Sequence, residues 1–138
     1  QIIEAETFAD GRSALVAVGT RRYRVQTWLP DDPYPQADIE EYPDTPAVVA
    51  DADTLHATVT KLTNCLARIG DLGQPLGPIP EISDDLELGS MQIAALAPIG
   101  AFDKQQMLAA PGPDERLALL GPALDEALEL IEFRLGER

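Results

Sequence analysis

The chain has 138 residues, 45% hydrophobic and 25% charged, a composition typical of one soluble domain or of two small layers that share a core. Its formal net charge of -14 disfavours contact with the phosphates of nucleic acids and with anionic lipid surfaces. Cys65 is the only cysteine, which excludes an internal disulfide and a cysteine-rich zinc site.

The sequence begins at Gln1 without an initiator Met, in residues with strand-like alternation, so we expect a piece of a longer protein. No charged segment followed by an apolar core marks a signal peptide. The apolar runs are far shorter than the roughly 20 residues of a membrane-spanning helix. These features predict a cytoplasmic protein.

Residues 1–46 are predicted to form four short strands. Apolar or small residues alternate with charged ones over 1–7, which is the period of a half-buried strand. Over 23–29, alternate residues share one face: Tyr23, Val25, Thr27 and Leu29. Residues 14–18 are apolar throughout and predict burial on both faces. Asp10-Gly11 supplies the turn before them, because Gly accepts positive φ without steric cost. A fourth strand is expected over 34–41, with Pro35 delaying its start or placing it at an edge.

The period changes from 2 to 3.6 near Ala47, so residues 47–138 are predicted to form a helical bundle. The first helix is expected to begin at a cap, Asp51 or Asp53, and to end at Gly70. Its apolar positions have helical spacing: Leu55, Val59, Leu62, Leu66 and Ile69.

Three more helices are expected in this bundle. Ser83 is predicted to cap the second, which runs to Ala97, and Asp103 is predicted to cap a short third. The fourth begins near Pro113. Gly121-Pro122 interrupts its apolar stripe and predicts a kink or a break into two helices, because an internal Pro costs about 3 kcal/mol.

The motifs that carry enzyme chemistry are absent from the sequence. No Gly-rich phosphate loop occurs, so nothing marks nucleotide binding. His56 and Cys65 lie nine residues apart on one predicted helix and therefore on opposite faces, which excludes a Cys/His dyad. Helix capping explains all but one of the clustered acids, and the calcium-loop spacing is missing. We expect no catalytic residue, no metal and no cofactor. The acids considered as ligands are Asp51, Asp53, Asp84, Asp85 and Glu87.

The local positive patch consists of three arginines beside aromatic residues. Bases could stack on Tyr23 and Trp28 while arginines meet phosphates, as in single-strand binding. We expect cross-strand pairing with Glu4 and Glu6 to engage the arginines instead. The arginines are Arg21, Arg22 and Arg24.

Two segments, GRSALVAVGTRRYRV and DPYPQADIEEYPD, resemble the second half of the Lon protease N-terminal domain, a PUA-like β-fold. The shared order is a D-G turn, an apolar strand that leads into G-x-x-R-[YF]-x-V, then D-P-Y and an acidic strand. The helical remainder is similar through Asp103-Lys104-Gln105 and Glu115-Arg116-Leu117. The family's opening segments are missing, and Gly121-Pro122 interrupts a helix that is usually continuous. The matching residues are Gly11, Gly19, Arg22, Tyr23, Val25, Pro33 and Tyr34.

The resemblance implies an α+β protein, with later strands of a PUA-like fold in residues 1–46 and a helical bundle in residues 47–138. It implies a non-enzymatic recognition module for unfolded or degron-bearing polypeptide or for a protein partner. The chain looks like a stand-alone member, because the family's ATPase and Ser-Lys peptidase domains are absent from it and it stops at Arg138 just after the bundle. Binding is expected on apolar surface left between the two layers. Trp28 and Tyr34 are the predicted polypeptide contacts, with core packing as the rival interpretation.

Two other functions remain open at this stage. RNA binding occurs in PUA-like folds and is the alternative, although the net charge of -14 disfavours it. A hydrolase would need catalytic groups from a missing upstream segment. The incomplete sheet predicts an exposed first strand, which an upstream half or a second copy in a homo-oligomer would cover.

Overall fold

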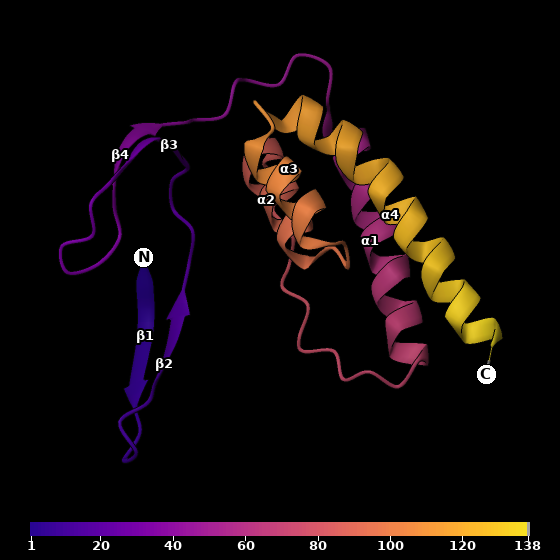
Figure 1. Ribbon diagram of the computed structural model, residues 1–138. Helices are drawn as coiled ribbons and strands as arrows, with labels where there is room; N and C mark the ends of the chain where they lie inside the picture. Colours follow the sequence, from indigo (N-terminus) through magenta and orange to yellow (C-terminus); the bar gives the residue numbers. More distant parts are fainter. Residues whose placement is uncertain (138) are drawn as a thin grey trace. The chain divides into compact units, whose positions relative to one another are not determined.

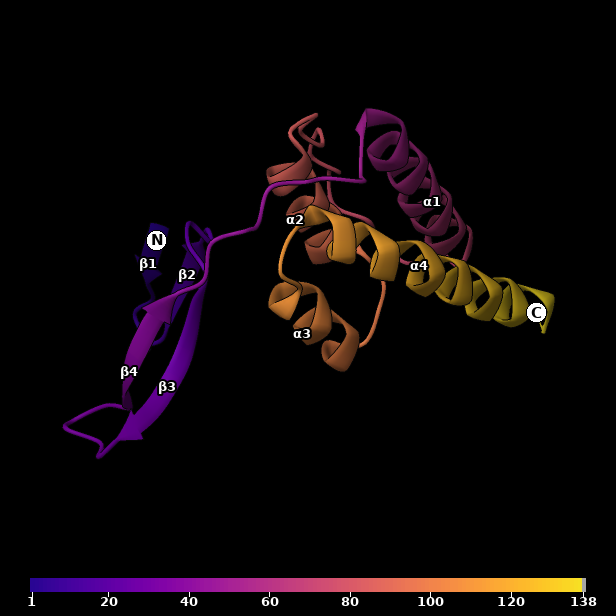
Figure 2. The ribbon, with the colours of Figure 1, turned by 90° about the horizontal axis from the view of Figure 1, so that it is seen from above.

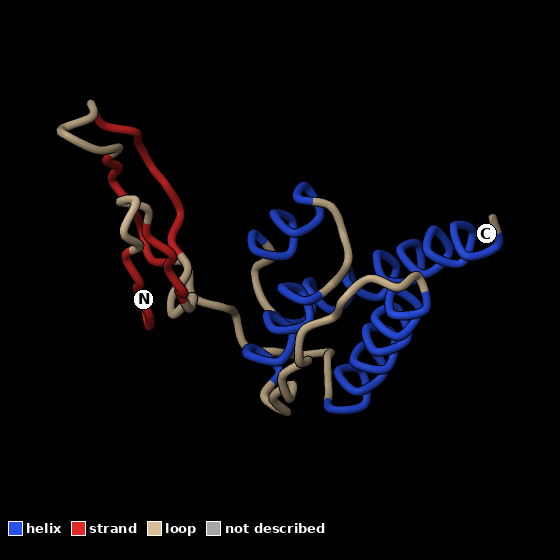
Figure 3. The backbone as a smooth tube through the Cα atoms, turned by 90° about the horizontal axis from the view of Figure 1, so that it is seen from below, coloured by secondary structure: helices blue, strands red, loops and turns tan. Residues whose placement is uncertain are grey.

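The structure is a computed structural model that describes residues 1–137. Four strands are followed by four helices, which confirms the predicted α+β class (Figure 1). The chain divides into two compact units, Gln1–Pro43 and Asp44–Arg138. We call them the hairpin unit and the helical unit and describe each by itself. Figure 3 shows the strands of the first in red and the helices of the second in blue.

The hairpin unit consists of two separate two-stranded sheets. β1 (Ile2–Thr7) pairs antiparallel with β2 (Ser13–Ala17), and β3 (Tyr23–Leu29) pairs antiparallel with β4 (Gln36–Glu41). The turn predicted at Asp10-Gly11 is confirmed, since Gly11 has a φ of 86°. β4 begins directly after Pro35, as expected for a residue that has no N–H to donate.

The prediction that residues 14–18 are buried on both faces is wrong. Every residue of β2 is exposed, with Leu15 at 58% and Val16 at 48% of their full accessibility. An apolar strand becomes buried only where a second layer covers it, and each sheet of this unit has two strands and no such layer.

The helical unit contains α1 (Ala52–Asp71), α2 (Leu86–Leu96), α3 (Ala101–Ala109) and α4 (Pro113–Gly136). The two long helices, α1 and α4, pack together and run in the same direction (Figure 2). Lys61 of α1 pairs with Asp125 of α4, and further along both helices Arg68 and Glu132 line the same hollow. No helix among the described residues has the length and hydropathy needed to cross a membrane.

One apolar core fills the space between these helices, and α2 and α3 contribute to it. It contains Leu55, Leu62 and Leu66 of the stripe predicted for the first helix, and Val59 and Ile69 pack against it partly buried, which confirms the period-3.6 pattern. Its buried members are Leu55, Leu62, Cys65, Leu66, Ile93, Ala94, Ala97, Met107, Leu117, Leu120, Leu124 and Ile131.

The N-terminal end of α1 agrees with the prediction from the sequence, and its C-terminal end does not. The Asp51 side chain caps its N-terminus by accepting a hydrogen bond from the Thr54 N–H at 2.9 Å, as predicted. Its C-terminal stop was assigned to the wrong glycine. Gly70 lies inside the helix, and the chain leaves it at Gly73, whose φ of 76° is the left-handed conformation that ends helices.

The predicted caps of α2 and α3 are wrong by two or three residues. Asp85 caps α2 by accepting from Leu88 N–H at 2.8 Å, while the Ser83 hydroxyl accepts from Asp85 N–H at 3.2 Å. Both side chains are of the type that caps helices, but only Asp85 stands three residues before Leu88, whose N–H has no carbonyl partner within the helix. α3 begins after Gly100, so Asp103 lies in its first turn rather than at its cap.

α4 does not break at Pro122, so the prediction of two helices is wrong. The helix is continuous from Pro113 to Gly136 with Pro122 inside it. Pro122 is exposed, and so is Ala118, the residue whose carbonyl loses its partner. Water can therefore hydrate that carbonyl, while the apolar face of α4 keeps its packing.

Candidate functional site

The two predicted contact residues belong to the same hairpin. Trp28 lies on β3 opposite Ala37 of β4, and Tyr34 lies in the loop that joins these strands. Both side chains are strongly exposed, Trp28 at 70% and Tyr34 at 64% of full accessibility. Their role in binding stays a prediction, but neither ring is buried as a core residue would be.

The loop that carries Tyr34 is held by hydrogen bonds within the same hairpin. Asp32 N–H donates to the Tyr34 carbonyl at 3.2 Å, and the Gln36 side-chain amide donates to the Asp32 carbonyl at 2.6 Å. The peptide bond between Asp32 and Pro33 is cis. The two hydrogen bonds hold the backbone of the loop in which Tyr34 lies.

Trp28 and Tyr34 are part of a wider exposed apolar set. No residue of 1–43 is buried, although this unit is rich in large apolar side chains. Soluble proteins rarely expose that many in so short a segment unless they bind something there. We call this set the hairpin apolar surface: Ile2, Ile3, Phe8, Leu15, Val16, Val18, Tyr23, Val25, Trp28, Leu29, Tyr34 and Ile39.

The arginines of the hairpin unit have partners other than those predicted. The Arg21 guanidinium donates to the Glu41 carboxylate at 2.7 Å. The guanidinium carbons of Arg22 and Arg24 lie 4.7 Å and 4.2 Å from the centre of the Tyr42 ring. Pairing with the acids of β1 is wrong because β3 pairs with β4, so β4 supplies the cross-strand carboxylates.

Cys65 and His56 have the different surroundings that their spacing predicts. Cys65 is fully buried, and its thiol donates to the Leu124 carbonyl at 3.3 Å. Burial raises the pKa of this thiol, and the negative charge of Asp125 raises it further, so the reactive thiolate is disfavoured. His56 is exposed on the other side of α1, with its Nε2 3.3 Å from an oxygen of Asp84.

Two of the acids considered as metal ligands cap helices. Asp51 and Asp85 cap α1 and α2, and hydrogen bonds from Thr54 lower the pKa of Asp51. Across residues 1–137, no three His, Cys, Asp or Glu side chains converge as a metal site would require.

A buried ion pair in the helical unit was missed by reasoning from the sequence. Arg116 of α4 is completely buried, and its two terminal nitrogens each donate to one oxygen of Asp44 at 2.8 Å. It also donates to the Ser90 hydroxyl at 2.8 Å and to the Met107 carbonyl at 3.1 Å. These bonds tie residue 44 to three helices. In the sequence, Arg116 is marked only as part of the Glu-Arg-Leu motif of the family, which identifies neither its burial nor its partner.

The carboxylate of Asp114 binds residues 48–50, which follow Asp44 in the chain. The oxygens of Asp114 accept from the N–H groups of Val48 at 2.8 Å, Val49 at 3.1 Å and Ala50 at 2.8 Å. These backbone donors lower the pKa of Asp114. Thr45 N–H donates to the Pro111 carbonyl at 2.9 Å. Residues 44–50 are therefore bound along the start of α4 as an ordered strap.

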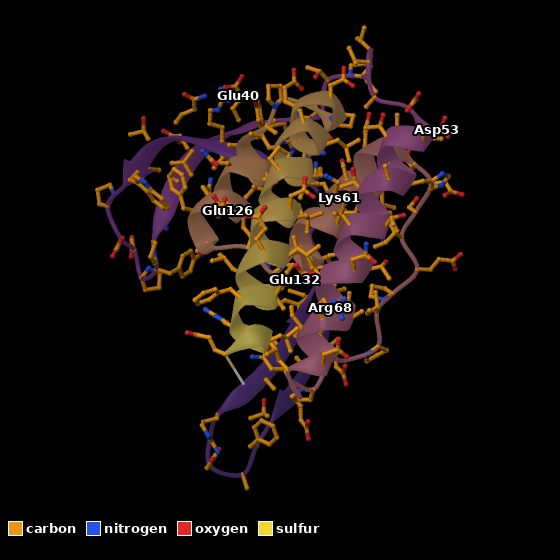
Figure 4. The ribbon with its side chains drawn as sticks, turned by 90° about the vertical axis from the view of Figure 1, so that its right-hand side faces the viewer. Glu40, Asp53, Lys61, Arg68, Glu126 and Glu132 are labelled. Atoms are coloured by element: carbon orange, nitrogen blue, oxygen red, sulfur yellow. The ribbon has the colours of Figure 1, made fainter. Side chains whose placement is uncertain are left out.

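Two of the hollows among the described residues of the helical unit are candidate sites. The first lies between α1 and α4, has a volume of about 320 Å³ and is lined by charges of both signs, with Arg68 engaged by Asp71 at 3.2 Å. Figure 4 labels two of its residues, Arg68 on α1 and Glu132 on α4. The second lies beside the strap at the start of α2 and α4. Neither has the depth or the convergent polar groups of an enzyme site.

Comparison with known proteins gives one family. No curated protein sequence matches the chain. A family model matches residues 1–126, which include both hairpins and most of the helical unit. That model describes the substrate-binding domain of the protease and includes no ATPase or peptidase domain. A match over most of the sequence, together with the α+β fold, assigns the family: the chain belongs to the ATP-dependent protease La (LON) substrate-binding domain family.

Proposed function

We propose that this chain is a non-enzymatic protein-recognition module that binds unfolded or degron-bearing polypeptide through the hairpin apolar surface. Membership of the family implies protein substrates in general. The observation that carries the finer proposal is the exposure of that surface, with Trp28 at 70% and Tyr34 at 64%. Large aromatic side chains are the commonest anchors of protein interfaces, because they bury much apolar area with few rotatable bonds.

The backbone of the hairpins also suits a polypeptide ligand. Each sheet has only two strands, so every strand has one edge whose N–H and C=O groups face away from its partner. An extended chain can add to such an edge by main-chain hydrogen bonds, which depend little on its sequence. Apolar contacts and edge pairing together favour unfolded segments over folded surfaces.

The test is a fluorescence anisotropy titration of the full chain into a labelled, permanently unfolded polypeptide, at low and at high salt. We expect saturable binding that survives salt, because apolar contacts are not screened. Replacing both Trp28 and Tyr34 with Ala should weaken it roughly 30-fold or more, since an anchor pair contributes at least about 2 kcal/mol. The matched control is Phe102→Ala with Phe133→Ala, which removes two aromatic rings that are 74% and 67% exposed in the helical unit.

Three results would contradict the proposal. The first is absence of binding, which would point to a dedicated folded partner. The second is equal weakening in the Phe control variant. The third is unchanged binding in the variant without Trp28 and Tyr34. A parallel titration with labelled single-stranded RNA tests the alternative. Affinity that falls steeply with salt and depends on Arg22 and Arg24 would favour RNA binding.

A further inference from the structure

The second hollow of the helical unit combines apolar and acidic side chains. It has a volume of about 360 Å³ and lies where the strap, the start of α2 and the start of α4 meet. Four of its residues are apolar, and the other three are carboxylates on the α2 side. We call it the acidic hollow. Its lining residues are Pro46, Ala47, Leu86, Pro113, Asp84, Asp85 and Glu87.

Two valines next to the acidic hollow are unusually exposed. Val48 and Val49 follow Ala47 in the strap and are 88% and 83% exposed. Their backbone is nevertheless fixed, because the Asp114 carboxylate accepts a hydrogen bond from both of their N–H groups. β-Branched side chains have few rotamers, so little further freedom would be lost when a partner covers them.

The charge around the acidic hollow has one sign. Asp85 is used as the cap of α2, and Asp84 lies 3.3 Å from His56. The Glu87 carboxylate makes no hydrogen bond or ion pair with any residue of the described range 1–137. No Lys or Arg lines the acidic hollow. Like charges held together favour a cationic group over a neutral or anionic one.

We propose that the acidic hollow and Val48-Val49 dock a polypeptide segment in which an aliphatic residue stands next to a lysine or arginine. The aliphatic side chain would contact Val48 and the apolar lining, and the cation would face Glu87. A second copy of this chain is disfavoured as the occupant, because a two-fold contact would bring the same three carboxylates together. The site lies in the helical unit and does not depend on the role proposed for Trp28 and Tyr34.

The test uses a labelled 12-residue peptide of leucine, lysine and serine and a matched peptide with glutamate in place of lysine. Both are titrated by anisotropy into the full chain that carries Trp28→Ala and Tyr34→Ala, so that the two proposed aromatic anchors of the hairpin apolar surface do not contribute. We expect saturable binding of the lysine peptide, weakening with salt, and at least tenfold weaker binding of the glutamate peptide.

Two variants locate the binding. Glu87→Lys should weaken the lysine peptide roughly 3- to 10-fold, because it replaces an exposed attraction with a repulsion. Val48→Ser should weaken it up to about tenfold through lost apolar contact. Glu132→Lys is the control, since it changes the net charge equally at the other hollow and should leave the affinity within about twofold. Far-UV circular dichroism checks that each variant is folded.

Several outcomes would overturn the proposal. They are no saturable binding of the lysine peptide, equal binding of the glutamate peptide, or equal loss in the Glu87→Lys and Glu132→Lys variants. A dimer in sedimentation velocity that disappears with Val48→Ser would also overturn it, because a second copy would then cover the surface. Each of these leaves the binding of unfolded polypeptide by the hairpins as a separate result.

Discussion

Replacing Asp44 with Ala removes the carboxylate that faces the buried guanidinium of Arg116. Two hydrogen bonds of 2.8 Å are lost, and the cation keeps only the Ser90 hydroxyl and the Met107 carbonyl. Both side chains are buried, Arg116 at 0% and Asp44 at 7% exposure. Breaking a buried ion pair from one side costs about 3–5 kcal/mol, which is a large fraction of the roughly 5–15 kcal/mol that stabilises a typical domain.

Urea unfolding followed by circular dichroism at 222 nm measures this loss, because helices dominate that signal. In thermal unfolding, a loss of 3 kcal/mol should lower the melting temperature by roughly 12–24 °C, the range for a domain of roughly 60–100 residues such as the helical unit. The control is Asp125→Ala, which removes the same group from an exposed pair with Lys61, at 55% and 40% exposure. An exposed pair contributes under about 1 kcal/mol.

The double variant Asp44→Leu with Arg116→Met separates the pair from its surroundings. Removing both charges should recover most of the stability lost in the single variant, because no buried charge remains without a partner. A loss below about 1 kcal/mol for Asp44→Ala, or a double variant that is no more stable than Asp44→Ala, would refute the reasoning.

Three further substitutions or conditions test the helical unit. Backbone hydrogen bonds hold the pKa of Asp114 below its ordinary value near 3.8. The contribution of Asp114 to the free energy of unfolding should therefore be present above about pH 4 and be lost as the pH falls further. Asp114→Asn should flatten the acid side of a curve of stability against pH. Gly89→Ala should cost about 1–3 kcal/mol in urea unfolding, since its Cβ would lie 2.3 Å from the Ser83 carbonyl oxygen, whereas Gly70→Ala should stabilise by up to about 1 kcal/mol. Cys65 should react with a thiol reagent at the rate of global unfolding, and rapid labelling of the native chain would contradict its burial.

The elements of this fold were largely readable from local patterns, because hydrophobic period and turn chemistry act over a few residues. β3 and α1 illustrate this, since alternation gave the first and 3.6-residue spacing gave the second. The errors arose where two local signals competed. Ser83 and Asp85 could each cap α2, and Pro122 could break α4 or lie on its exposed side.

Long-range partners could not be read in the same way. The Arg116 and Asp44 side chains meet across 72 residues, and no periodic pattern relates them. Arg21 pairs with Glu41 of β4 rather than with the acids of β1, and Arg24 stacks on Tyr42 just after β4. Strand order, which local sequence does not encode, decides these cross-strand contacts. The candidate aromatics were found because large rings beside a polar loop form a local signal.

The two units differ in burial, which allows stability and the proposed recognition to be tested separately. The buried residues of the described chain all lie in the helical unit, so its core and the Arg116 pair should dominate a global unfolding measurement. The hairpin unit has paired strands but no buried residue, so its apolar side chains contribute little to a buried core. Substituting Trp28 should therefore change polypeptide affinity without changing the unfolding of the helices. Asp44→Ala should lower the stability of the helices and leave polypeptide affinity unchanged, when binding is measured well below the melting temperature of that variant. If one substitution changed both properties, the two units would have to be energetically coupled.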